Sequence, residues 1–124
     1  MKIFLGIAAA LAWFFGAMLI AMPEKFYEPA GVAMTPLVAT LAQAHGATLI
    51  GLGFIDWLAR SADRQGLIAV LGGNLVVQLL SLLVVLRTMQ LGAGAAVTPG
   101  VVIHVVLGSL FAYFLVQTRN AKLP

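Results

Sequence analysis

Three side chains of this protein could bind a cofactor in an apolar environment: His45, Gln78 and His104. Each lies within a long stretch of sequence that carries no charged residue. A neutral imidazole can ligate haem iron or hydrogen-bond a quinone headgroup, and the glutamine amide adds a third group with ligand atoms. These residues therefore form a candidate binding site for haem b or a quinone.

The alternative is that the same side chains hydrogen-bond neighbouring helices. His, Gln, Asn, Ser and Thr within membrane spans commonly bond across helix interfaces, and this structural role is the more frequent one. We therefore predict hydrogen bonding between helices as the leading role and cofactor binding as the alternative.

Polar residues before position 61 also have spacings that predict structural contacts. Asp56 and Arg60 are four residues apart, which predicts an ion pair on one helix face, with Trp57 beside them as an interfacial anchor. A proton-relay role for Asp56 would require burial away from Arg60. Gln43 projects almost opposite to His45, so one of the two is predicted to contact a different neighbour or an oligomer partner.

Two further polar residues are predicted to have structural roles in the second half of the chain. Asn74 lies one helical turn before Gln78 and shares its face. Tyr113 is four residues from Ser109, and we expect these two to form an inward-facing hydrogen-bonded pair.

Several motifs of known chemistry are missing from the sequence. It contains no cysteine, which excludes disulfides and thiolate metal sites. It has no Gly-rich phosphate loop, no His-Glu-x-x-His run and no nucleophile elbow. No Asp or Glu lies near the centre of a hydrophobic segment, where a small multidrug antiporter requires one. The sequence therefore predicts no metal site, and it favours a protein without enzymatic activity.

The elements that carry these residues are four uncharged stretches, at 3–23, 29–55, 65–86 and 88–118. The chain is 62% hydrophobic and only 9% charged, far from the composition of soluble domains. Each stretch holds a helix of roughly 20 residues, long enough to cross the hydrocarbon core of a bilayer. We predict an all-α, polytopic membrane protein with a four-transmembrane-helix bundle.

The predicted spans are about 3–22, 36–59, 67–86 and 99–117, within one transmembrane domain that covers residues 1–124. Thr35-Pro36 and Thr98-Pro99 are predicted to begin the second and fourth spans, with Thr as the cap and Pro in the first turn. The segment 23–34 is predicted to be a loop at the headgroup level. Alternating span direction places the three ligand-capable side chains in the outer half of the bilayer.

The basic residues predict the orientation of the chain. Five of the seven fall on the side that holds both termini: Lys2, Arg60, Arg64, Arg119 and Lys122. Only Lys25 and Arg87 lie on the other side, so the positive-inside rule predicts cytoplasmic termini. Because these residues are scattered and form no patch, the net charge of +3 does not predict nucleic-acid binding.

The order of features resembles small bacterial four-span proteins of the broad DoxX-like kind. The resemblance rests on Met22-Pro23-Glu24-Lys25-Phe26-Tyr27, on Ala44-His45-Gly46-Ala47 leading to Gly51-Leu52-Gly53, and on Phe111-Ala112-Tyr113-Phe114. Such proteins often have Arg where this chain has Gln43. Some relatives are membrane subunits of quinone-linked oxidoreductases, so the resemblance implies a bacterial inner-membrane location and an accessory role beside a redox partner.

The leading prediction for function is a non-enzymatic subunit or scaffold of a larger membrane assembly, with a membrane-protein partner or a homo-oligomer in the lipid bilayer. The alternatives are a redox or lipophilic-ligand-binding protein that uses the intramembrane histidines, and a transporter of a small solute with a path past Asn74 and Gln78.

Overall fold

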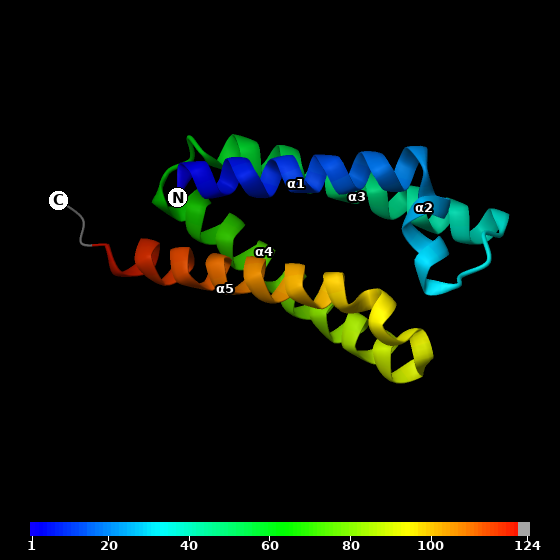
Figure 1. Cartoon of the computed structure of the whole chain (residues 1–124). Coiled ribbons are helices and arrows are strands. Elements are labelled where there is room, and N and C mark those ends of the chain that lie inside the picture. The colour runs from blue at the N-terminus through cyan, green and yellow to red at the C-terminus, as the bar shows by residue number, and fades with distance from the viewer. Residues whose placement is uncertain (122–124) are drawn as a thin grey trace. The chain divides into compact units, whose positions relative to one another are not determined.

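The computed structural model describes residues 1–121, apart from the side chains at 93 and 95, and the described chain is helical without strands (Figure 1). The long helices are α1 (Lys2–Ala21), α3 (Pro36–Ala59), α4 (Arg64–Thr88) and α5 (Thr98–Asn120). All four are long and apolar enough to cross a membrane. The predicted all-α class with four membrane spans is therefore confirmed.

Short helical elements join the long helices at two places. Between α1 and α3 lie α2 (Pro23–Tyr27) and the 3-10 turn η1 (Glu28–Ala30), so the prediction of a plain loop at 23–34 is wrong for residues 23–30. Pro23 occupies the first turn of α2, where a missing amide hydrogen costs nothing. Between α4 and α5 lie η2 (Met89–Ala93) and η3 (Gly94–Val97).

The helix starts test the capping predictions. The side chain of Thr35 accepts a hydrogen bond from the Val38 amide at 3.3 Å and caps α3, as predicted. Thr98 does not cap α5, because it is already the first residue of that helix and Val97 precedes it as the cap. Asp63 caps α4 by accepting from the Gly66 amide at 2.8 Å. This cap starts α4 three residues earlier than the predicted span, which began at Leu67.

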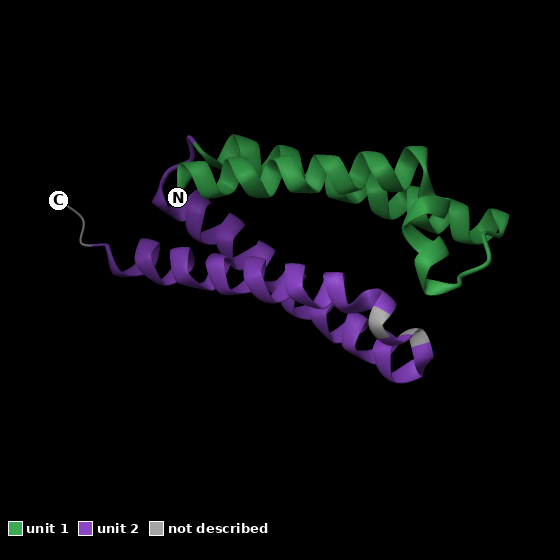
Figure 2. Cartoon of the chain, viewed as in Figure 1, with its two compact units in different colours: residues 1–60 green, residues 61–124 purple. Residues whose placement is uncertain are grey.

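The chain divides into two compact units, and each contains two of the long helices (Figure 2). Unit 1 is Met1–Arg60 and unit 2 begins at Ser61. The prediction of a single transmembrane domain stays a prediction.

In unit 1, α1 and α3 run antiparallel in close contact. A Cβ placed on Gly16 would lie 2.7 Å from the carbonyl oxygen of Gly46, and one on Gly46 would lie 2.6 Å from the carbonyl oxygen of Gly16. Further along, a Cβ on Gly53 would meet the Trp13 ring at 2.6 Å and the Ala9 carbonyl oxygen at 3.0 Å. Glycine at these positions lets the two backbones approach more closely than any side chain would allow.

In unit 2, α4 and α5 also run antiparallel, but at ordinary packing distances. A Cβ on Gly100 would lie 3.5 Å from the Val85 side chain, and one on Gly108 would lie 3.4 Å from the Cβ of Gln78. These contacts place the small residues of α5 against α4, and they also position the side chains that carry the polar contacts of this unit.

Candidate functional site

A polar contact between two side chains of the spans joins α4 to α5 in unit 2. His104 Nδ1 lies 2.8 Å from Gln78 Oε1. Because an amide oxygen only accepts hydrogen bonds, the imidazole is the donor in this contact. Gln78 is 7% exposed and His104 is half-buried. Two of the three predicted cofactor-binding residues are therefore brought into direct contact.

Asn74 lies one turn before Gln78 on α4 and is 2% exposed. Its Nδ2 donates to the Val70 carbonyl oxygen of the same helix at 3.1 Å. Both amides are buried on α4, as their four-residue spacing leads one to expect. This face of α4 carries the polar core of unit 2.

His45 lies on α3 in unit 1, where its side chain is exposed. Its predicted participation in a site with Gln78 and His104 stays a prediction. Gln43, two residues earlier, donates from Nε2 to the Ile20 carbonyl oxygen of α1 at 3.3 Å. Gln43 thus contacts the partner helix of its own unit.

A cluster of aromatic rings with one cation occupies the Arg60 end of unit 1. The Trp13 ring lies 5.2 Å from that of Phe54 and 5.6 Å from that of Trp57, between centroids. Arg60 Cζ lies 4.0 Å from the centroid of the Trp57 ring, which is a cation–π contact. Asp56 is 1% exposed on the same helix, and its predicted ion pair with Arg60 stays a prediction.

The structure corrects the prediction for Tyr113. This side chain is 56% exposed on α5 and so does not face inward. Its hydroxyl accepts a hydrogen bond from Gln117 Nε2 at 3.4 Å, one turn further along, in place of the predicted pairing with Ser109. Both positions lie four residues from Tyr113, so the spacing did not distinguish between them.

Arg64 makes a contact that the sequence did not predict. Its Nε donates to the Thr118 carbonyl oxygen at 3.0 Å and its Nη2 to that of Arg119 at 2.7 Å. These carbonyls belong to the last turn of α5, where backbone oxygens have no partner within the helix. The only sequence signal was a cation beside an N-cap, which does not identify a partner 54 residues away.

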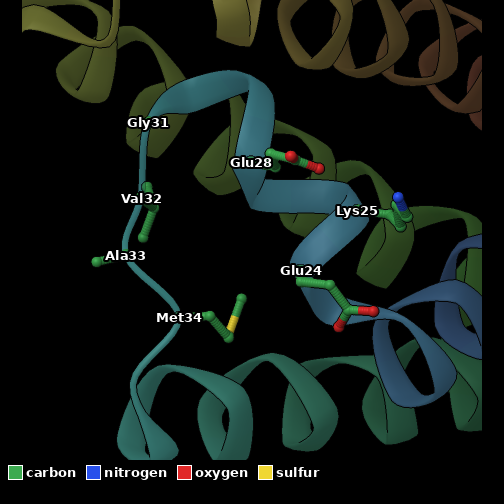
Figure 3. A pocket seen from close by; sticks show the side chains of 7 residues that line it. All are labelled: Glu24, Lys25, Glu28, Gly31, Val32, Ala33 and Met34. Atoms are coloured by element: carbon green, nitrogen blue, oxygen red, sulfur yellow. The ribbon is translucent and has the colours of Figure 1, made fainter.

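A hollow of about 510 Å³ lies among the residues that follow α1. Figure 3 shows Glu24, Lys25 and Glu28 on one side of it and Val32, Ala33 and Met34 on the other. Its charged side chains are all exposed. Among the described residues, no group of three or more His, Asp or Glu could hold a metal ion.

The four apolar helices define a multi-pass membrane protein of the all-α class, surrounded by lipid. The chain matches no family model, no curated protein and no solved structure.

Proposed function

We propose that the protein is a non-enzymatic subunit or scaffold of a larger membrane assembly. The observation that carries this proposal is that the polar side chains of the spans serve the packing of the helices. Gln43 bonds the backbone of α1, and Gln78 and His104 bond each other across α4 and α5. Side chains used in this way stabilise a fold, and they resemble the polar contacts that hold membrane helices together.

The short connections within the chain support the same proposal. The segments outside the long helices in the first half are 22–35 and 60–63, and α2 and η1 occupy much of the first. Neither segment is large enough to form a soluble catalytic domain. We infer that a partner protein supplies any chemistry of the assembly.

Exposed glycines on the spans are suited to contact with another membrane helix. Gly51 on α3 and Gly73 on α4 are exposed, and a Cβ on either would meet no described atom within 4 Å. Glycine at a helix surface allows a second helix to approach closely. The partner we propose is therefore a transmembrane helix, of another protein or of a second copy of this chain.

The DoxX-like resemblance extends the proposal to a bacterial inner membrane and to a redox partner linked to quinone. The positive-inside pattern extends it to cytoplasmic termini. A reporter fused to each terminus, active on only one side of the membrane, would test the orientation.

The test of the subunit proposal is the native mass of the protein in mild detergent. Extraction from native membranes is expected to yield a complex larger than one 13.0 kDa chain, with a partner in fixed stoichiometry. A photo-reactive residue at Gly51 or Gly73 is expected to cross-link to that partner, whereas one at Ile3, which is 80% exposed, serves as the lipid-facing control. A single unassociated chain without cross-links would contradict the proposal.

The second candidate function is the binding of haem b or a quinone, and the contact between His104 and Gln78 favours it. Histidines that bind metals or cofactors typically donate one ring nitrogen to a neighbouring oxygen, which orients the other toward the ligand. Gln78 Oε1, 2.8 Å from His104 Nδ1, is a neighbouring oxygen of this kind. An absorption spectrum of protein expressed with sufficient haem would test the haem version.

Quinone binding requires a separate measurement. The double variant His45→Ala, His104→Ala is expected to lose quinone binding, and unchanged binding would contradict a quinone site. Solute transport, the third alternative, stays a prediction.

A further inference from the structure

Arg60 is the C-cap residue of α3 and directly follows Ala59, the last residue of the helix. Its guanidinium is stacked on Trp57, three residues earlier, with Cζ 4.0 Å from the ring centroid. Arg60 is half-buried and Trp57 is 45% exposed. The indole therefore holds the cation at a helix end, the level at which lipid headgroups meet a membrane span.

The inner edge of this guanidinium is turned toward α1. Arg60 Nε is buried without a hydrogen-bond partner, and a Cβ on Gly6 would lie 3.8 Å from it. Nε therefore makes no bond that would compensate the charge. The distal nitrogens, Nη1 and Nη2, form the planar fork that binds phosphate oxygens in pairs.

The charges differ between the two ends of unit 1. Because α1 and α3 are antiparallel, Lys2 at the start of α1 lies at the same end as Arg60, one turn before Gly6. The other end carries Glu24, Lys25 and Glu28, with two acidic groups against one basic. The Arg60 end carries two basic groups, Lys2 and Arg60, against the one acidic group of Asp56, and is thus complementary to an anion.

We propose that Arg60, held on Trp57 and assisted by Lys2, binds the phosphate of an anionic phospholipid at this end of unit 1. Asp56 does not compete for all of the donors. Nη1 and Nη2 together carry four N–H groups, and a carboxylate accepts two in a bidentate pair, so the predicted ion pair would leave two donors for a lipid phosphate.

The two tryptophans of the chain provide a direct measurement. In a Trp13→Phe background, Trp57 is the sole indole and reports on lipid beside Arg60. The Trp13 substitution removes no hydrogen bond, because Trp13 Nε1 has no hydrogen-bond partner, and it keeps an aromatic ring at this position. The protein is reconstituted in phosphatidylcholine vesicles that contain either brominated phosphatidylglycerol or, at equal mole fraction, brominated phosphatidylcholine.

We expect brominated phosphatidylglycerol to quench Trp57 more strongly, corresponding to a local enrichment of about fivefold. Arg60→Gln is expected to abolish this excess, and Lys2→Gln to reduce it. Lys25→Gln removes one positive charge at the opposite end and is expected to leave the excess unchanged. Equal quenching by the two lipids, or an excess that survives in Arg60→Gln, would overturn the proposal.

The variant Arg60→Lys distinguishes binding by the guanidinium from general attraction of anionic lipids to a positive charge. It also keeps the charge, and so provides a second test if Arg60→Gln fails to fold. Lysine lacks the planar fork and the stacked geometry, so most of the excess should be lost. If Arg60→Lys showed the same excess quenching as the protein that keeps Arg60, the proposed site would be ruled out. Glycerol phosphate added to the vesicles is expected to leave quenching unchanged, and full relief of quenching would instead assign the site to a free phosphate ester.

Discussion

The two units hold their helix pairs together by different means. Unit 1 relies on close backbone approach, since Gly16 and Gly46 face each other at distances that leave no room for a side chain. Unit 2 relies on polar side chains that cross between helices, with Gln78 bonded to His104 and Arg64 bonded to the end of α5.

The difference reflects the solvent around the helices. In lipid, burial of apolar surface does not drive two helices together, so association depends on tight van der Waals packing or on hydrogen bonds. Unit 1 uses mainly tight van der Waals packing, and unit 2 uses mainly hydrogen bonds. The predictions below test this division, beginning with the largest expected effect.

Gly46→Val is expected to destabilise unit 1 by about 3 kcal/mol or more, because its Cβ would lie 2.6 Å from a backbone oxygen that cannot move aside independently. The change in free energy of unfolding in mixed micelles measures this effect. Gly51→Val on the same helix is the matched control, because Gly51 has open space around it, and a change below about 0.5 kcal/mol is expected. Equal destabilisation by both substitutions would show that close approach is not what holds unit 1.

Arg64→Met is expected to cost unit 2 about 1.5 kcal/mol, because two charge-assisted hydrogen bonds to the last turn of α5 are lost. Hydrogen exchange should become faster at the amides of that turn, which frays when its carbonyls lose their partners. Arg87→Met removes an exposed cation at the other end of α4 and should leave this exchange unchanged. Slow exchange retained in Arg64→Met would argue against a stabilising role of these hydrogen bonds.

The smallest expected effect is the coupling between Gln78 and His104. A double-mutant cycle with Gln78→Leu and His104→Leu is expected to give a coupling free energy of about 0.6 kcal/mol, the average for hydrogen bonds between membrane helices. The control cycle combines Gln78→Leu with Tyr113→Phe, which are not in contact, and should be additive within about 0.3 kcal/mol. The same coupling in both cycles would mean that the measured bond does not contribute to the pairing of α4 with α5.

The helices could be predicted from the sequence because their cause is local. Long uncharged stretches bounded by charged residues require a structure that satisfies every backbone group in lipid, and the helix does so within one segment. Helix ends were predicted less well. Thr35 caps α3, whereas the same Thr-Pro pair at Thr98 does not cap α5, because the turn η3 leads into that helix without a break.

The polar contacts could be predicted only in part. Helical spacing placed Asn74 and Gln78 on one face of α4, and both are buried there. The hydrogen-bond partners of Tyr113 and Arg64 depend on which atoms the folded chain brings within bonding distance. Residue types alone do not contain that information, because Tyr113 had two partners at equal spacing and the partner of Arg64 lies 54 residues away.

The order of residues by itself determined that this chain spans the membrane four times, because an uncharged run of that length has no stable place in water. The close approach of Gly16 to Gly46, the contact of His104 with Gln78 and the stacking of Arg60 on Trp57 were decided only by the folded helices. These features join atoms on different helices or on successive helical turns. Their distances depend on how the backbones cross and on which rotamers the packing allows, and a one-dimensional pattern does not specify either.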